Sequence, residues 1–174
     1  MMNFKELLPN VKAFIFDVDG VLSTAAIPLF PGGEPMRVIN TKDGYALSQA
    51  AKKGFPLGII SGGKTEAVHV RFAGLGFTDI HLGVHLKTEK LAEFLEKHKL
   101  NASEVLYMGD DIPDLPCMKM VGIPVCPADA VPEIKDISLY ISDRTGGNGC
   151  VRDVVEQVLR AQGLWLTDVE AFGW

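Results

Sequence analysis

Residues 11–23 read VKAFIFDVDGVLS, an apolar run that ends in two aspartates, Asp17 and Asp19. The run is short and rich in β-forming residues, which is typical of a buried strand. A carboxylate is costly to bury alone, so both aspartates must be paired, bound to a metal or solvated. A plain Asp/Gly turn after the strand also accounts for DVDG, because both residue types favour turns. The rest of the chain has to separate these two interpretations.

Similar apolar runs recur along the chain, each bounded by Gly, Pro or Asp, at residues 11–17, 56–61, 79–83, 104–110, 122–126 and 139–142. Helical patterns lie between them at residues 43–54, 87–99 and 148–163. The last of these has Val and Leu at i, i+3, i+4, i+7 and i+8, a stripe that faces a core. Strands that alternate with helices predict right-handed βαβ crossovers. We therefore expect an α/β fold with a doubly wound, mostly parallel sheet.

One segment, residues 24–40, breaks this alternation. Two short extended runs flank the letters PGGE, which predicts a β-hairpin inserted after the first strand. The chain shows no repeat and no linker, and its 174 residues, 47% of them hydrophobic, suit one domain over 1–174. Residues 163–174 form a tail whose apolar side chains favour a packed position over a free one.

Composition excludes several classes of partner. The formal net charge is −5 and no basic run offsets it, which argues against nucleic acid. The N-terminus lacks the pattern of a signal peptide, and no apolar run approaches the roughly 20 residues that span a bilayer. The three cysteines form no CxxC pair, as expected for buried thiols in a reducing compartment. We expect a soluble, cytoplasmic protein with no membrane partner.

Polar residues follow the predicted strands at their carboxyl ends. Asp17 ends the first strand, Ser61 the second, and Asp110 and Asp111 the fourth, while Lys87 opens the helix after the third. Ligands bind at this edge of a parallel sheet. A plain turn after the first strand does not predict such a gathering, so a functional site is favoured.

The acidic residues of this edge need a cation to offset their mutual repulsion; they are Asp17, Asp19, Asp110, Asp111 and Asp114. An all-oxygen set suits Mg²⁺, which commonly also takes a substrate phosphate oxygen as a ligand. One carboxylate can then attack phosphorus while a second transfers protons. Ser61 and Lys87 are of the right types to hold phosphoryl oxygens.

The stretches DVDGV, IISGG, Lys87 and GDDIPD resemble, in order, the four motifs of the haloacid dehalogenase superfamily of phosphatases. The resemblance implies catalytic roles for four residues: Asp17 as nucleophile, Asp19 as general acid/base, and Ser61 and Lys87 as phosphoryl-binding groups. It also implies Mg²⁺ as cofactor. Its expected ligands are Asp17, the backbone carbonyl of Asp19 and Asp110, with Asp111 and Asp114 supporting the metal or Lys87.

Three other metal or nucleotide sites fit less well. An EF-hand loop needs a closing Glu at its twelfth position, and a dinucleotide site needs G-x-G-x-x-G after the first strand. Neither pattern is present in the sequence. Receiver-type signalling domains place the acidic pair early and the phosphoacceptor later, whereas here the acidic cluster comes late.

The finer pattern is similar to the 3-deoxy-D-manno-octulosonate 8-phosphate phosphatases of the same superfamily, and phosphatases of nine-carbon keto acids share it. Only a hairpin and one helix fit between Asp17 and Ser61, so we expect no cap domain. The substrate implied is a sugar-acid phosphate in lipopolysaccharide precursor synthesis, with a nonulosonate 9-phosphate as the alternative. Its expected binding residues are Gly62, Lys64 and Arg71, although the two basic side chains also suit a solvated helix face.

Gly63 and Asn148 depart from the family pattern, which leaves the choice of sugar open. We expect Arg37, in the hairpin, to serve surface or interface contacts. The resemblance further implies a homotetramer with hairpins at its centre and tails that reach a neighbouring active site. Packing of the tail on its own domain is the alternative. A non-catalytic oligomerisation module, the third functional reading, predicts eroded catalytic positions, and here each holds the expected residue type.

Overall fold

The protein is described here from a computed structural model that covers residues 3–167 and 169–173. Within them, six parallel strands form one sheet in the order β3-β2-β1-β4-β5-β6. The strands are β1 (Ala13–Phe16), β2 (Leu57–Ile60), β3 (Asp79–His81), β4 (Val105–Met108), β5 (Ile123–Cys126) and β6 (Tyr140–Ile141). Each strand lies in one of the six apolar runs. The predicted α/β fold with a doubly wound, parallel sheet is therefore confirmed.

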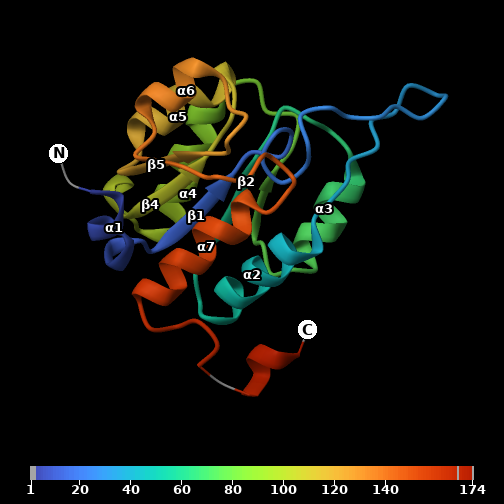
Figure 1. Cartoon of the computed structure of the whole chain (residues 1–174). Helices are drawn as coiled ribbons and strands as arrows, with labels where there is room; N and C mark the ends of the chain where they lie inside the picture. The colour runs from blue at the N-terminus through green and yellow to red at the C-terminus, as the bar shows by residue number, and fades with distance from the viewer. Residues whose placement is uncertain (1–2, 168, 174) are drawn as a thin grey trace.

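Helices cover both faces of the sheet (Figure 1). One face carries α1 (Phe4–Leu7), α2 (Thr41–Lys52), α3 (Glu66–Ala73) and α7 (Cys150–Ala161). The other carries α4 (Lys87–His98), α5 (Leu115–Met120) and α6 (Pro132–Ile137). Short 3₁₀ turns are η1 (Leu8–Asn10), η2 (Ala102–Glu104), η3 (Ile112–Asp114) and η4 (Val169–Phe172).

The central strand β1 is buried on both sides. Phe14 and Phe16 pack into the core beneath α2 and α7, whereas Ala13 and Ile15 pack into the core beneath α4 and α5. A strand with two covered faces needs apolar residues at every position rather than at alternate ones. This explains the unbroken apolar run that precedes Asp17.

The helix caps follow from the local sequence. The side chain of Asn40 accepts hydrogen bonds from the first turn of α2, with Lys42 N at 2.8 Å. Gly54 adopts a φ of +84° just after the same helix, as the predicted helix end requires. The apolar stripe of α7 is wholly buried, from Val151 to Leu159.

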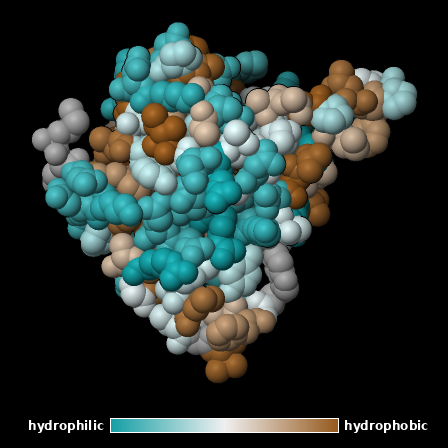
Figure 2. All heavy atoms as spheres, viewed as in Figure 1, coloured by the Kyte–Doolittle hydropathy of each residue, from teal (hydrophilic) through white to brown (hydrophobic). Residues whose placement is uncertain are grey.

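Residues 28–36 project from the domain as a loop (Figure 1). A single antiparallel bridge joins Leu29 to Pro35, with a hydrogen bond from Phe30 N to Glu34 O at 2.8 Å. The predicted hairpin between residues 24 and 40 thus turns back on itself but forms no strands. Prolines in both arms lack the N–H that a longer ladder needs. Figure 2 shows apolar side chains on this projection, where Leu29 is 67% exposed.

The C-terminal tail packs partly on its own domain. Trp165 meets the ring of Tyr45 edge-on, and the guanidinium of Arg152 lies 4.7 Å from the Trp165 ring centroid. The hydroxyl of Tyr45 donates to the carbonyl of Ala171. In contrast, Phe172 remains exposed. Trp174, the last apolar residue of the predicted tail, lies outside the described residues.

We predicted that the chain has no cap domain and no membrane-spanning segment. Between β1 and β2 the described chain contains the projecting loop and α2, and it contains no cap domain. In the described part of the chain, no helix combines the length and apolar character that crossing a membrane requires.

The strand order fixes where a ligand can bind. Since β1 lies between β2 and β4, the chain leaves β1 toward one edge of the sheet and later returns to build the other. The crevice outside the carboxyl end of β1 is thus the switch point at which α/β sheets bind ligands. Asp17 stands at this point.

Candidate active site

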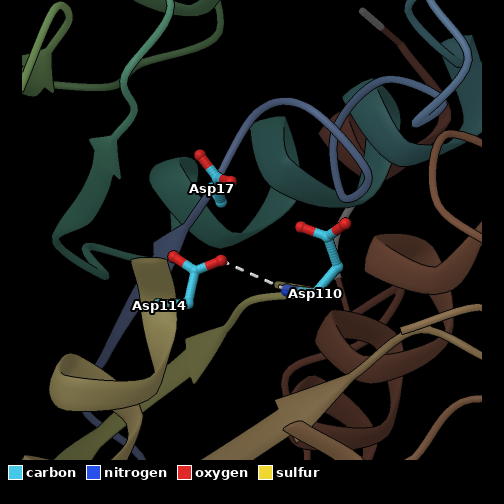
Figure 3. A group of neighbouring side chains, drawn as sticks. All are labelled: Asp17, Asp110 and Asp114. Atoms are coloured by element: carbon cyan, nitrogen blue, oxygen red, sulfur yellow. Dashed lines mark hydrogen bonds between the residues drawn. The ribbon is translucent and has the colours of Figure 1, made fainter. Parts of the chain in front are cut away.

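Three carboxylates converge beyond the carboxyl ends of β1 and β4 (Figure 3). Asp17 follows β1 directly, Asp110 comes two residues after β4, and Asp114 ends the short turn η3. One oxygen from each carboxylate lies within 4.8 Å of the others. The fold therefore brings together acidic side chains that are almost a hundred residues apart in the sequence.

A glycine makes this convergence sterically possible. Gly20 has a φ of +86°, and a Cβ at this position would overlap the carboxylate of Asp110. Any other residue would be strained here and would push Asp110 away from the turn. The DVDG turn therefore requires its final glycine for the packing of the site as well as for its own backbone.

Lys87 supplies the buried positive charge of the cluster. From the first position of α4, its Nζ lies 3.0 Å from Asp17 Oδ1 and 2.8 Å from Asp114 Oδ1. Asp114 also accepts hydrogen bonds from the hydroxyl of Tyr107 at 2.8 Å and from the backbone N–H of Asp110 at 3.2 Å. Asp114 thus holds Lys87 in place, in line with its predicted supporting role.

Burial and repulsion shift the acidity of these groups. The pKa of Asp17 is raised by burial first and by the charge of Asp114 second. Burial, together with Asp17 and Asp114, raises the pKa of Asp110 to about 8. Burial opposes the charged form of Lys87, yet the carboxylates of Asp17 and Asp114 raise the pKa of Lys87 above its ordinary value. One ammonium group does not offset three carboxylates, so the cluster favours an added cation.

The donor set fits Mg²⁺. All three side chains offer carboxylate oxygens, which hard cations prefer. Oδ1 of Asp110 is buried and has no hydrogen-bond partner among the described residues. Because Asp114 is already occupied by its donors, Asp17 and Asp110 are the side chains best placed to ligate. The backbone carbonyl of Asp19 stays a predicted ligand.

Asp111 lies apart from this cluster. It is exposed, and its Oδ1 accepts a hydrogen bond from Ile112 N at 2.8 Å, which caps η3. Its charge contributes to the raised pKa of Asp110 after burial, Asp17 and Asp114. The support predicted for Asp111 is therefore a long-range one in this structure, without direct contact to Lys87.

Asp19 pairs with Arg37, a residue of the projecting loop that we expected to make surface or interface contacts. Arg37 Nε lies 2.6 Å from Asp19 Oδ1, and Arg37 Nη2 lies 2.8 Å from Asp19 Oδ2. Arg37 also donates to the hydroxyl of Thr65. The hydrogen bonds that Arg37 donates to the Asp19 carboxylate raise the pKa of Arg37 above its ordinary value. The expectation of a surface role for Arg37 is wrong, because its side chain is only 6% exposed and its guanidinium lies beside the carboxylate of Asp19. An interface contact of Arg37 stays a prediction.

Arg37 was not predicted as a site residue because loop residues have no structural period. One signal was available in Gly63. A Cβ at Gly63 would come within 2.5 Å of Arg37 Nη2, so the glycine leaves room for the guanidinium.

The turn after β2 carries predicted phosphoryl-binding and substrate-binding residues. Ser61 is 2% exposed, and its Oγ accepts a hydrogen bond from Gly63 N at 3.2 Å. Gly62 is exposed beside it. Lys64 is exposed too, and the space above Gly83 is filled by the Lys64 alkyl chain. Arg71 lies in the last turn of α3, where its guanidinium approaches Gly44 of α2, so the structure does not bring it to the carboxylate cluster.

The sequence of this chain matches a family model and is similar to curated proteins. A family model described as haloacid dehalogenase-like hydrolase matches residues 42–128. The 3-deoxy-D-manno-octulosonate 8-phosphate phosphatase of Escherichia coli (strain K12) is 38% identical over 154 residues, which are 88% of this chain and 82% of that protein.

Solved structures of phosphatases with the same name are similar to this chain in fold. The 3-deoxy-D-manno-octulosonate 8-phosphate phosphatase from Yersinia pestis superposes with a TM-score of 0.88 at 32% identity, covering 92% of this chain and 86% of that one. The phosphatase of the same name from Moraxella catarrhalis, in complex with magnesium ion, phosphate ion and a KDO molecule, superposes with a TM-score of 0.87 at 32% identity. That match covers 92% of both chains.

Proposed function

The chain belongs to the haloacid dehalogenase-like hydrolase family, and on this basis we propose that it is a phosphatase of 3-deoxy-D-manno-octulosonate 8-phosphate in lipopolysaccharide precursor synthesis. The observation that carries the chemistry is the buried contact of Lys87 with Asp17 beside Asp110. The substrate is supported by the relatives named for this reaction and by the KDO-bound neighbour.

In the proposed first step, a carboxylate oxygen of Asp17 attacks the phosphorus atom. The new bond from Asp17 to phosphorus forms as the bond from phosphorus to the sugar oxygen breaks, giving an aspartyl-phosphate and an alcohol. Asp19 donates the proton that the leaving oxygen takes up. Asp19 is suited to this task because its side chain is 32% exposed and can turn toward the substrate.

In the second step, Asp19 accepts a proton from water as the water attacks phosphorus. The bond between phosphorus and Asp17 breaks, and inorganic phosphate leaves with the enzyme unchanged. Throughout, Lys87 and Ser61 hold the equatorial oxygens of the phosphoryl group, on which negative charge is spread. Asp114 keeps the ammonium group of Lys87 in position.

The cofactor is Mg²⁺, and Asp17 and Asp110 would hold it, with the carbonyl of Asp19 as the third protein ligand. When bound, it offsets the carboxylate charges and the charge of the phosphoryl oxygens. Without such a cation, two anions would repel each other as Asp17 approached the substrate.

The projecting loop bears on how the subunits assemble. We expect a cytoplasmic homotetramer, in which the exposed apolar side chains of the projecting loop become buried between subunits. The exposures of Leu29 and Phe30, 67% and 49%, support such a contact. Sedimentation at assay concentration tests it, and a species that stays monomeric would contradict it.

The substrate is tested with a panel of phosphomonoesters at neutral pH in the presence of Mg²⁺. The panel contains octulosonate 8-phosphate, a nonulosonate 9-phosphate and simple hexose phosphates. We expect the highest kcat/KM on the octulosonate. Preference for the nonulosonate would move the enzyme to nine-carbon keto acids, and equally low rates on all would contradict both substrates.

A further inference from the structure

We propose that Arg37 is a substrate-recognition residue that exchanges its partner Asp19 for an anionic group of the substrate. This deepens the function proposed above and rests on it. The exchange would make the release of Asp19 for proton transfer depend on the arrival of the correct substrate.

The contacts of Arg37 support an exchange of this kind. Its side chain is only 6% exposed, whereas that of Asp19 is 32% exposed. The guanidinium donates to both oxygens of the Asp19 carboxylate and to the hydroxyl of Thr65. A sheltered guanidinium left without an anion is strongly unfavourable. Asp19 can therefore turn away at low cost only if another anion takes its place.

The position of the guanidinium places it within reach of a bound substrate. It contacts Asp19, two residues after the predicted nucleophile, and it lies over Gly63, two residues after Ser61. Arg37 thus joins the turn that presents Asp17 to the turn that presents Ser61. A substrate phosphoryl group bound between these turns would bring its own oxygens, or the rest of the molecule, to the Arg37 side chain.

A route to Arg37 from solvent is also present. A hollow of about 720 Å³ opens between the projecting loop and the start of α3, and Arg37 and Thr65 form part of its wall. Lys64 lines the same hollow as a second positive charge, and Glu34 and Glu66 line it as well. The preference for an anion therefore rests on the guanidinium of Arg37 and its pairing with the Asp19 carboxylate, not on the net charge of the hollow.

Two anionic groups of the substrate can replace the Asp19 carboxylate. Each offers a pair of oxygens that matches the paired N–H donors of the guanidinium. One source is the carboxylate of the sugar acid, and the other is the phosphoryl group itself. They are separated by measuring the binding of each part alone, with 3-deoxy-D-manno-octulosonate and inorganic phosphate as probes.

The experiment is isothermal calorimetry in Mg²⁺ with the wild-type protein and the variant Arg37→Gln. Arg160→Gln is the matched control, because Arg160 lies on the surface of α7 and pairs with Glu156. We expect Arg37→Gln to weaken one of the two probes by about tenfold or more, the value of a hydrogen bond to a charged group. Weaker binding of the sugar acid identifies the carboxylate, and weaker binding of phosphate identifies the phosphoryl group.

A second variant reaches the same contact without removing the charge. Gly63→Ala would place a Cβ 2.5 Å from Arg37 Nη2, too close for both atoms, and push the flexible guanidinium aside. It should weaken the same probe as Arg37→Gln, with thermal melting used to confirm that both variants fold.

Unchanged affinity of Arg37→Gln for both probes, or no binding of either probe by the wild-type protein, would overturn the role of Arg37. Phosphate release from octulosonate 8-phosphate and p-nitrophenyl phosphate is measured separately. Absence of hydrolysis by the wild-type protein contradicts the proposed function, whereas the binding data judge Arg37 independently of turnover.

Discussion

Lys87 Nζ lies 3.0 Å from Oδ1 of Asp17, and both side chains are almost completely buried. The pair joins the end of β1 to the first turn of α4, across the switch point of the sheet. Lys87 therefore has two tasks, since it balances carboxylates in the folded protein and would hold phosphoryl oxygens during turnover. Both tasks can be tested by substitution.

Replacement of Lys87 should destabilise the fold as well as stop catalysis. Lys87→Met leaves Asp17 and Asp114 buried without their cation, which should cost about 3 kcal/mol in the free energy of unfolding. Urea denaturation at pH 7 in chelator measures this cost. The matched control is Lys90→Met on the same helix, which removes a surface pair with Glu93 worth less than about 1 kcal/mol. Equal stability of the two variants would show that Asp17 and Asp114 do not need Lys87.

Removal of the metal should stop turnover, and the same ion should stabilise the protein. EDTA is expected to abolish phosphate release and added Mg²⁺ to restore it. A ligand present at 100 times its Kd adds about 2.7 kcal/mol to the free energy of unfolding, which is visible in thermal melting. Asp110→Asn should relieve repulsion within the cluster and lose this Mg²⁺-dependent gain. If Asp110→Asn gains as much as the wild-type protein, Asp110 does not ligate the ion.

A buried carboxylate away from the site makes the stability pH-dependent. Asp43 accepts a hydrogen bond from Arg152 N at 2.6 Å, yet burial raises the pKa of Asp43 from 3.8 to about 6. The folded state therefore retains a proton that the unfolded state releases between these two pH values. Stability should fall as pH rises from 3.8 to about 6 and stay level in this respect above it.

The contribution of Asp43 is isolated by comparison with Asp43→Asn, which does not titrate. The difference in unfolding free energy between the two proteins should change by about 2–3 kcal/mol across this window, from the size of the pKa shift. Chemical denaturation at closely spaced pH values measures the difference. A difference that stays constant with pH would show that Asp43 titrates normally in the folded protein.

The tail offers a test of where its apolar side chains are buried. Trp165→Ala should cost about 3 kcal/mol, because the ring packs against Tyr45 and beneath Arg152. Phe172→Ala should change the unfolding free energy by less than about 0.5 kcal/mol, because Phe172 is 80% exposed. Chemical denaturation of both variants measures these changes in unfolding free energy. A large cost for Phe172→Ala would place that ring in a contact with another subunit.

Much of the fold could be predicted from the sequence because strand and helix periods are local. The six apolar runs became the six strands, and Lys87 opens α4 as expected. The carboxyl-edge rule then placed Asp17, Ser61 and Asp110 at one crevice. These inferences needed only the period of each segment and the direction of the strands.

The loop between β1 and α2 was predicted only in part. The chain turns back on itself around PGGE as expected, with Leu29 bridged to Pro35, but the direction of Arg37 depends on its contact with Asp19 in the turn after β1. Arg71 shows the converse problem. Its place after β2 suggested the site, but its position in the last turn of α3 turns it toward α2. Contacts of long side chains across elements are set by packing, which periodicity does not describe.

The role of Asp17 as the nucleophile is tested by Mg²⁺-dependent phosphate release from octulosonate 8-phosphate, measured for the wild-type protein and for Asp17→Asn. The variant keeps the shape of the side chain but removes the nucleophilic carboxylate. We predict turnover by the wild-type protein and a loss of at least about a thousandfold in Asp17→Asn, with the fold intact by circular dichroism. Substantial turnover by Asp17→Asn would contradict the assignment of Asp17 as the nucleophile.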